Sequence, residues 1–123
     1  MGKSRWKVVK YVDLKSIEET FNNVYDFEIL KHKTGQRLKE LVQNYPNNFL
    51  KDEQGSLPKG LNYSDLSIRY KCVNIFINNF DREVPFFRIC FDLVHPMTGI
   101  QIFYYDVDYN IDGKFSDEYF GRY

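Results

Sequence analysis

The sequence predicts a single α+β domain in which N-terminal helices pack on a C-terminal antiparallel sheet. Three observations lead to this fold class: the chain has 123 residues, its first half spaces apolar side chains as helices do, and its second half alternates as strands do. This length fits one domain over residues 1–123 with one hydrophobic core. We therefore expect helices first and then a meander of about four strands.

The first expected helix covers residues 13–25. Asp13 is a suitable N-cap for it. Apolar side chains then recur at helical spacing, at Leu14, Ile17, Phe21, Val24 and Tyr25. Ahead of this helix, residues 6–12 alternate loosely, which fits a short edge strand or an extended arm.

A second helical pattern follows Thr34 and Gly35 and stops at Pro46. Its apolar positions are Leu38, Leu41, Val42 and Tyr45. Residues 27–30 fit either a continuation of the first helix or a break in it, and the pattern does not decide between the two.

A long loop is expected from Pro46 to Ser64, where Asn, Pro, Gly, Ser and Asp accumulate. Four apolar residues should pin it at intervals: Phe49, Leu50, Leu57 and Leu61. Because it is long and has few such anchors, we expect residues 47–64 to be the most mobile internal segment.

Four strands are expected after the loop, over residues 68–77, 86–94, 100–109 and 114–120. In the first of them the alternation changes phase near Cys72 and Val73, which indicates a bulge or burial on both faces. Turns are expected at residues 95–99 and at Asp112-Gly113, since Asp-Gly between apolar runs is a strong hairpin signal.

The second expected strand places its apolar residues on one face, opposite the apolar side of the second helix. That core should contain Phe87, Ile89, Phe91 and Leu93, with Leu38, Leu41 and Val42 from the helix. The other sheet face remains half apolar through Phe86, Ile100, Ile102 and Tyr104. It is either a protein–protein interface or the second buried face of a curved sheet.

Composition argues against several functional classes. Basic and acidic side chains balance at 17 each, which argues against a strongly basic nucleic-acid binder. No apolar stretch approaches the length of a signal peptide or of a membrane span, so we expect a cytoplasmic protein. Cys72 and Cys90 are interpreted as small buried hydrophobic residues, with a bridge between neighbouring strands or a nucleophilic thiol as alternatives.

One segment resembles a calcium loop: Asp108, Asn110, Asp112 and Gly113 match its first positions. Its twelfth position, which needs a bidentate carboxylate, is Tyr119. The strand-like residues before it favour a hairpin turn, so no bound metal and no cofactor are expected.

No sequence motif assigns an enzymatic activity. His32 and His95 are the only histidines, and as an acid–base pair they would suit a small nuclease. They are equally typical of a surface helix and a turn. A glycine-rich phosphate loop, zinc-ligand spacing and a nucleophile elbow are all absent from the sequence, so we expect a protein that is not an enzyme.

Acidic side chains gather in the last expected hairpin. Asp106 and Asp108 should share a strand face with Tyr104, and the turn should return Asp117 and Glu118 to the same end. The predicted partner-binding residues are Tyr104, Asp106, Asp108, Asp112, Asp117 and Glu118. Such a surface favours a basic protein partner.

Residues 86–99, 104–108 and 117–120 resemble the small bacterial immunity proteins of contact-dependent inhibition and related polymorphic toxin systems. The resemblance lies in size, in aromatic and acidic strands and in the absence of a catalytic motif. It implies a cytoplasmic inhibitor that covers the active site of one cognate toxin domain, often a nuclease, without binding nucleic acid or membrane itself. The sequence leaves open an α+β domain that binds a small ligand or another protein, and a small nuclease.

Overall fold

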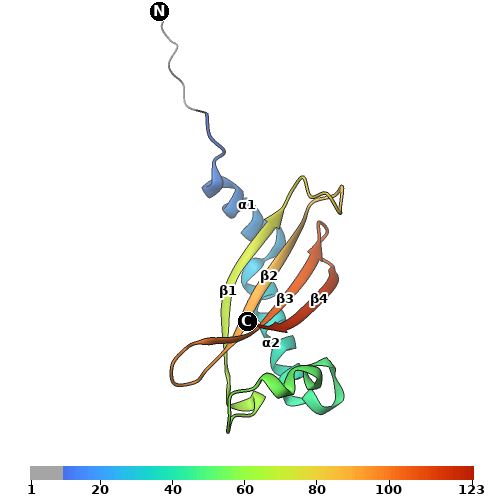
Figure 1. The fold of residues 1–123 in the computed structure, drawn as a ribbon. Helices are drawn as coiled ribbons and strands as arrows, with labels where there is room; N and C mark the ends of the chain where they lie inside the picture. The colour runs from blue at the N-terminus through green and yellow to red at the C-terminus, as the bar shows by residue number, and fades with distance from the viewer. Residues whose placement is uncertain (1–9) are drawn as a thin grey trace, which may run out of the picture.

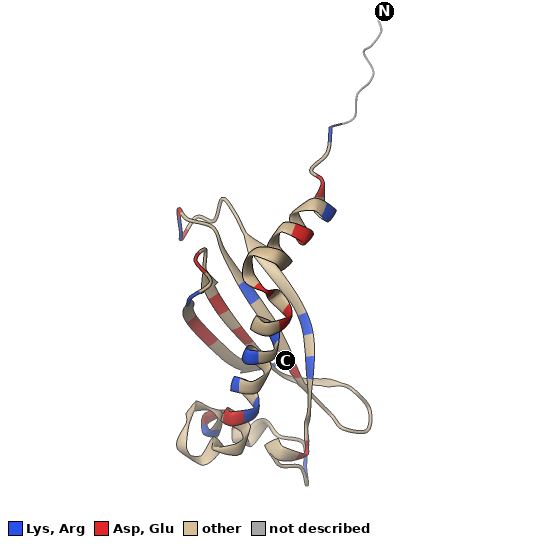
Figure 2. Ribbon diagram, turned by 180° about the vertical axis from the view of Figure 1, so that it is seen from behind, with Lys and Arg blue, Asp and Glu red and all other residues tan. Residues whose placement is uncertain are grey.

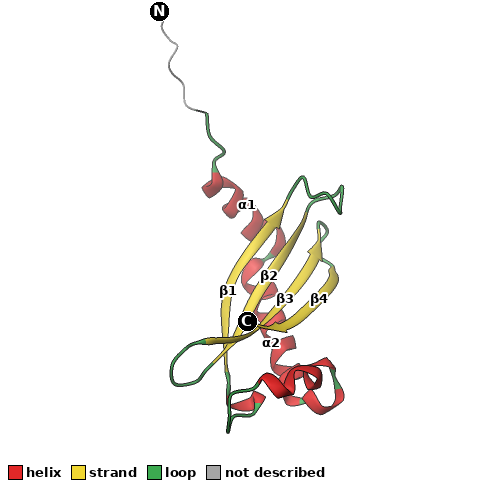
Figure 3. Ribbon diagram, in the orientation of Figure 1, coloured by secondary structure: helices red, strands yellow, loops and turns green. Residues whose placement is uncertain are grey.

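In the computed structural model, which describes residues 10–123, four antiparallel strands form one sheet and both α-helices lie on one face of it (Figure 1, Figure 3). The helices are α1 (Leu14–Tyr25) and α2 (Phe27–Gln43). The strands are β1 (Ser67–Phe76), β2 (Phe86–Val94), β3 (Gln101–Asn110) and β4 (Phe115–Arg122). This arrangement confirms the predicted α+β fold. Of the segment expected as an edge strand or arm, residues 6–9 lie outside the described residues.

The strands follow one another across the sheet in the order β1-β2-β3-β4. The prediction for β2 is confirmed to the residue, and the other three strands differ from their predicted ranges by one or two residues at each end. Irregularities of register occur between Tyr70 and Cys72, between Leu93 and Val94, and between Asp108 and Tyr109. The first of these explains the predicted change of phase, because an extra residue at Lys71 reverses the alternation.

Helix α1 begins and ends where the sequence predicts. The Asp13 side chain accepts a hydrogen bond from the backbone N–H of Ser16 at 3.2 Å. At Asp26 the backbone adopts a left-handed conformation with φ of 47°, which ends α1 and lets α2 start at Phe27. Residues 27–30 therefore belong to the second helix.

The predicted start of the second helix after Gly35 is wrong, because Thr34 and Gly35 lie in the middle of α2. Thr34 is a poor former of exposed helix, yet here its hydroxyl bonds both the carbonyl of Leu30 and the hydroxyl of Tyr109. Gly35 leaves room for the Phe91 ring, since a Cβ there would lie 3.1 Å from that ring. Tertiary contacts thus explain two residues that look like helix breakers in the sequence.

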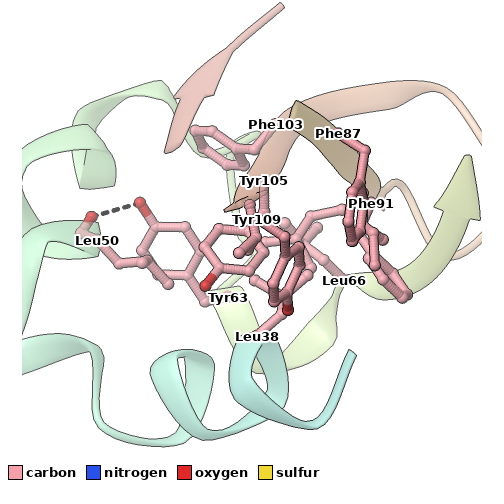
Figure 4. Close-up of a cluster of buried hydrophobic side chains, with 12 residues drawn as sticks. Leu38, Leu50, Tyr63, Leu66, Phe87, Phe91, Phe103, Tyr105 and Tyr109 are labelled. Atoms are coloured by element: carbon pink, nitrogen blue, oxygen red, sulfur yellow. Dashed lines mark hydrogen bonds between the residues drawn. The ribbon is translucent and has the colours of Figure 1, made fainter. Parts of the chain in front are cut away.

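The segment expected as a long loop is instead a series of short 3-10 helices, over Tyr45–Asn47, Phe49–Ser56 and Tyr63–Asp65. Leu50 and Tyr63 are completely buried, and the Tyr63 hydroxyl donates to the Leu50 carbonyl at 2.6 Å (Figure 4). The four predicted anchors, Phe49, Leu50, Leu57 and Leu61, all pack in or against the core. The expectation that the segment has few anchors is nevertheless wrong, because Tyr63 is buried as well.

The hydrophobic core lies between the helices and one face of the sheet, which we call the inner face. Its strand residues include the predicted Phe87, Ile89, Phe91 and Leu93, together with Phe103, Tyr105, Val107 and Tyr109 (Figure 4). Leu38 is fully buried against them, and Leu41 and Val42 pack at its margin, as predicted. Edge-on and stacked rings, such as Phe87 with Tyr109, fill much of this core.

Candidate functional site

The opposite face of the sheet, which we call the outer face, carries no helix within residues 10–123 (Figure 1). Its side chains nevertheless shield one another: Cys90, Asp92 and Asp108 are all less than a tenth exposed. The covering groups are long polar and aromatic side chains from β2, β3 and β4, together with Tyr123, which follows β4. We call the following set the outer-face network: Arg88, Asp92, Gln101, Tyr104, Asp106, Asp108, Asp117, Tyr119 and Tyr123.

An ion pair between neighbouring strands lies near the middle of this network. Arg88 on β2 stands opposite Asp108 on β3 and donates two hydrogen bonds to its carboxylate, at 2.6 and 3.1 Å. The guanidinium is also sandwiched by rings, at 4.9 Å from the Phe76 centroid and 5.1 Å from that of Tyr119. Because Asp108 and the two rings hold the guanidinium, the Arg88 side chain is preorganised, although 28% of it stays exposed.

A second cluster surrounds the buried carboxylate of Asp92. Gln101 donates to it at 2.7 Å, and the hydroxyl of Tyr123, the last residue, donates a short hydrogen bond to its other oxygen. Lys71 from β1 lies over the Tyr123 ring and donates to its hydroxyl at 3.3 Å. The Tyr123 side chain therefore links β4 to β2 and β1 across the outer face.

Tyr104 occupies its position because a neighbouring strand lacks a side chain. Gly121 on β4 stands opposite Tyr104, and a Cβ at Gly121 would lie 2.5 Å from the Tyr104 hydroxyl oxygen. The Tyr104 ring therefore rests on the β4 backbone and meets the Tyr123 ring edge-on, with centroids 5.9 Å apart. Only glycine permits this close contact.

The surroundings of the Asp106 carboxylate disfavour its ionised form. Burial raises the pKa of Asp106, and the Cys90 thiol and Arg88 only partly offset that effect. Burial also raises the pKa of the adjacent Cys90 thiol, with Asp106 adding to the rise, so this thiol stays protonated at neutral pH. Cys90 is thus poorly suited to act as a nucleophile.

Cys72 stands directly opposite Cys90 in the β1–β2 register, and both thiols are free. The strands that carry the two cysteines are therefore neighbours, as the alternative of a bridge required. The interpretation of Cys90 as a small buried residue agrees with its burial, while Cys72 is half-buried.

The structure brings together four of the six predicted partner-binding residues. Tyr104, Asp106, Asp108 and Asp117 all lie on the outer face, where Asp117 stands opposite Asp108. Asp112 lies in the β3–β4 turn, and its carboxylate accepts a hydrogen bond from the backbone of Lys114.

Glu118 lies apart from the others, on the helix side of the sheet. It forms an ion pair with Arg37 of α2 at 2.6 Å and accepts a hydrogen bond from the Tyr105 hydroxyl, also at 2.6 Å. Burial alone would raise the pKa of Glu118, but the hydrogen bonds from Arg37 and Tyr105 outweigh it and lower this pKa. Glu118 therefore fastens α2 to the sheet.

The expectation that Ile100 and Ile102 share a face with Tyr104 is wrong. The register shift between β2 and β3 turns Ile102 toward the core, and Gln101 takes the outer-face position beside Asp92. Ile100 precedes the strand and is exposed. One inserted residue is enough to exchange faces, because side chains alternate with a period of two.

The segment that resembles a calcium loop is a β-hairpin turn. Asp108 binds Arg88, Asn110 accepts from Arg82 at 2.7 Å, and Gly113 takes a φ of 83° at the turn. Over residues 10–123, no group of three His, Cys, Asp or Glu side chains is arranged to hold a metal ion.

The two histidines occupy different kinds of position. His95 accepts hydrogen bonds at Nδ1 from the backbone of Met97 and Thr98, which shapes the β2–β3 turn. His32 is exposed on α2 and borders a shallow hollow that also includes Gly35 and Tyr70. These placements correspond to the structural roles that the sequence allows for them.

Sequence reasoning missed Arg88, Asp92, Tyr119 and Tyr123 as members of the site. Arg88 and Asp92 alternate with the predicted core positions of β2, and charged residues at such positions of a central strand could have indicated cross-strand partners. Tyr123 gave no such signal, because its reach across three strands depends on the twist and register of the sheet.

In the part of the chain that the structure describes, no helix has both the length and the apolar character needed to cross a membrane. Comparisons with protein-family models, curated proteins and solved structures find no match for this chain.

Proposed function

We propose that this protein binds and neutralises a cognate bacterial toxin domain by covering its active site. The observation that supports this proposal is the outer face itself: a surface without a helix in the described chain, yet rich in ordered Tyr and Arg side chains. Tyr and Arg are over-represented among the residues that contribute most to protein–protein binding. A surface that needs no rearrangement also loses little entropy on association.

The charge of the outer face differs from one side to the other. The outer-face carboxylates of β3 and β4 are those of Asp106, Asp108 and Asp117, whereas β1 carries Arg69 and Lys71 (Figure 2). Arg88 neutralises Asp108, so Asp106 and Asp117 are the carboxylates left to attract a partner. A toxin that acts on nucleic acid needs a basic cleft. Asp106 and Asp117, beside the rings of Tyr104 and Tyr119, suit such a cleft.

The test begins with the gene neighbourhood. The toxin domain encoded directly upstream is purified, and its binding to this chain is measured by surface plasmon resonance at several salt concentrations. We expect tight binding and loss of toxin activity in the complex. An upstream gene without a toxin domain, or a toxin domain that this chain neither binds nor inhibits, contradicts the proposal.

Two variants then locate the interface. Asp106→Asn with Asp117→Asn should slow association and flatten its salt dependence, since these carboxylates act at long range. Tyr104→Ala should mainly speed dissociation, since it removes a buried contact. The matched control is Glu19→Gln with Glu40→Gln, which removes two exposed carboxylates from α1 and α2. Equal effects of the two double variants would place the interface elsewhere.

A further inference from the structure

We propose that Cys72 and Cys90 form a reversible oxidation site, at which oxidised glutathione, a small disulfide, converts the two thiols into a cross-strand disulfide. This inference goes beyond the proposed function, because it concerns the chemistry of the chain itself and needs no partner protein. Three observations support it: the register of β1 and β2, the contacts of the two sulfurs, and the difference in exposure between the two thiols.

The two cysteines occupy directly opposite positions on neighbouring strands. Cys72 of β1 pairs with Cys90 of β2, immediately after the bulge at Lys71. Opposite residues of antiparallel strands have Cα atoms about 4.5–5.5 Å apart. A disulfide joins residues whose Cα atoms are about 4.4–6.8 Å apart. The backbone therefore already holds the two cysteines at a bridging distance, without any change of register.

Contacts of the side chains place both sulfurs on the same face of the sheet. Asn74 follows Cys72 by two residues, so the two side chains point to the same side of β1. The amide nitrogen of Asn74 donates to the Cys90 sulfur at 3.6 Å, and its amide oxygen accepts from the Cys72 thiol at 3.9 Å. Because one amide group contacts both sulfurs, the two thiols are close neighbours in the folded chain.

The two thiols differ in exposure. Cys72 is half-buried and lines a groove of about 440 Å³ between α1 and β1, whereas Cys90 is 5% exposed. Burial raises the pKa of the Cys90 thiol, and the Asp106 carboxylate adds to this rise. A disulfide in solution therefore meets Cys72 first, and Cys90 reacts afterwards from within the sheet.

Two exchange steps form the bridge. The Cys72 thiolate attacks one sulfur of oxidised glutathione, so that a mixed disulfide forms at Cys72 and one glutathione leaves. Cys90 then loses its proton and attacks the Cys72 sulfur, which forms the Cys72–Cys90 bond and releases the second glutathione. The two cysteines lose two electrons and two protons in total, and oxidised glutathione becomes two molecules of the thiol.

The second step should be the slower one, because Cys90 releases its proton reluctantly. Its position opposite Cys72 compensates in part, since a reaction between groups held side by side proceeds as if at high concentration. We therefore expect the mixed disulfide at Cys72 to accumulate before the bridge appears.

The bridge would change both the edge of the sheet and the outer face. Within residues 10–123, β1 pairs with β2 alone, so a covalent bond would fasten this edge strand to the sheet. The Cys90 thiol is one of the groups that offset the burial of Asp106, and the bridge would remove its proton. Oxidation would thereby alter the surroundings of a carboxylate in the outer-face network.

The test incubates the full chain in buffers with different ratios of reduced to oxidised glutathione. After quenching in acid, mass spectrometry without reductant distinguishes free thiols, the mixed disulfide and the internal bridge. We expect the mixed disulfide at Cys72 to give way to the bridge, and dithiothreitol to reverse it. In urea, the equilibrium constant for bridging should be at least about tenfold smaller, because the folded strands hold the two cysteines in place.

Serine variants separate the two steps. Cys72→Ser should prevent attachment of glutathione to the folded chain, because Cys90 is buried. Cys90→Ser should stop at the mixed disulfide. Circular dichroism verifies the fold of each variant, and the experiment on the native chain does not depend on them.

The matched control is Cys72→Ser with Asn74→Cys, which keeps one thiol on the same face of β1 but diagonal to Cys90. Diagonal neighbours lie about 7–8 Å apart, too far for a bridge without movement of the backbone. The equilibrium constant for bridging should therefore fall at least about tenfold. A mixed disulfide that never resolves, disulfide-linked dimers in place of the internal bridge, or equal bridging in the diagonal control or in urea would overturn the proposal.

Discussion

The two faces of the sheet are buried by different means. On the inner face, β2 contributes Phe87, Ile89 and Leu93, and the helices cover this face, with Phe21 and Tyr25 of α1 packed on Phe87. On the outer face, the same strand contributes Arg88, Cys90 and Asp92, and side chains of neighbouring strands cover them. Both sets have low exposure, but the inner set excludes water with apolar groups and the outer set satisfies polar groups with one another.

This difference indicates that the two faces contribute differently to stability and to partner binding. Apolar residues of similar volume often stabilise a protein as well as or better than a buried ion pair does. An outer face built from Arg, Asp and Tyr is therefore expected to stabilise the sheet less than an apolar face of similar volume would. We infer that the inner face determines most of the stability, while the outer face provides fixed charges and rings for a partner.

The largest expected effect comes from the inner face. Phe91 is 5% exposed and packs against Tyr70 and Gly35. Phe91→Ala should lower the free energy of unfolding by about 3–5 kcal/mol, the usual range for a buried Phe. Urea denaturation measures it, and a loss below about 1 kcal/mol would show that this face is not the main core.

Removal of the Arg88 guanidinium should lower the free energy of unfolding by an intermediate amount. Arg88→Met keeps the length of the side chain but leaves the buried Asp108 carboxylate without its partner, at a cost of about 2 kcal/mol. The double variant Arg88→Met with Asp108→Asn should recover much of that loss, because no unpaired charge remains. If the single and double variants are equally unstable, the pair does not act as a unit.

The inner face could be predicted from the sequence better than the outer face. The inner face could be predicted because apolar residues of β2 alternate without interruption from Phe87 to Leu93. The outer face could be predicted only in part, because inserted residues at Lys71 and Ile102 shift the register and a strand sequence does not reveal them. The role of Glu118 was equally hidden, since its partner Arg37 is 81 residues away.

A smaller, pH-dependent effect is expected where α2 meets β4. The pKa of Glu118 in the folded protein lies below its ordinary value of 4.5, so the Arg37–Glu118 pair stabilises the fold above that pH and is lost as pH falls through the lower folded value. Arg37→Met should therefore cost about 1 kcal/mol at pH 7. The difference from the native protein should shrink below pH 4.5, and a difference independent of pH would contradict this account.

The smallest expected change in the free energy of unfolding is an increase rather than a loss. Burial raises the pKa of Asp106 in the folded state, so the ionised carboxylate opposes folding above its ordinary pKa, and this penalty diminishes as pH falls. Asp106→Asn should consequently raise the free energy of unfolding at pH 7 by up to about 1 kcal/mol while it weakens partner binding. Urea denaturation at pH 7 and pH 4 measures this difference. A variant that is less stable than the native protein at pH 7 would mean that the ionised Asp106 carboxylate stabilises the fold, which contradicts the prediction.

Hydroxyl-radical footprinting of the complex with the toxin domain tests the assignment of recognition to the outer face most directly. Mass spectrometry reports the oxidation rate of each reactive side chain with and without the partner. We predict strong protection of Tyr104, Tyr119 and Tyr123, with unchanged rates at the exposed Met97 and Phe80. Unchanged oxidation of Tyr119 and Tyr123 in a formed complex would contradict the account.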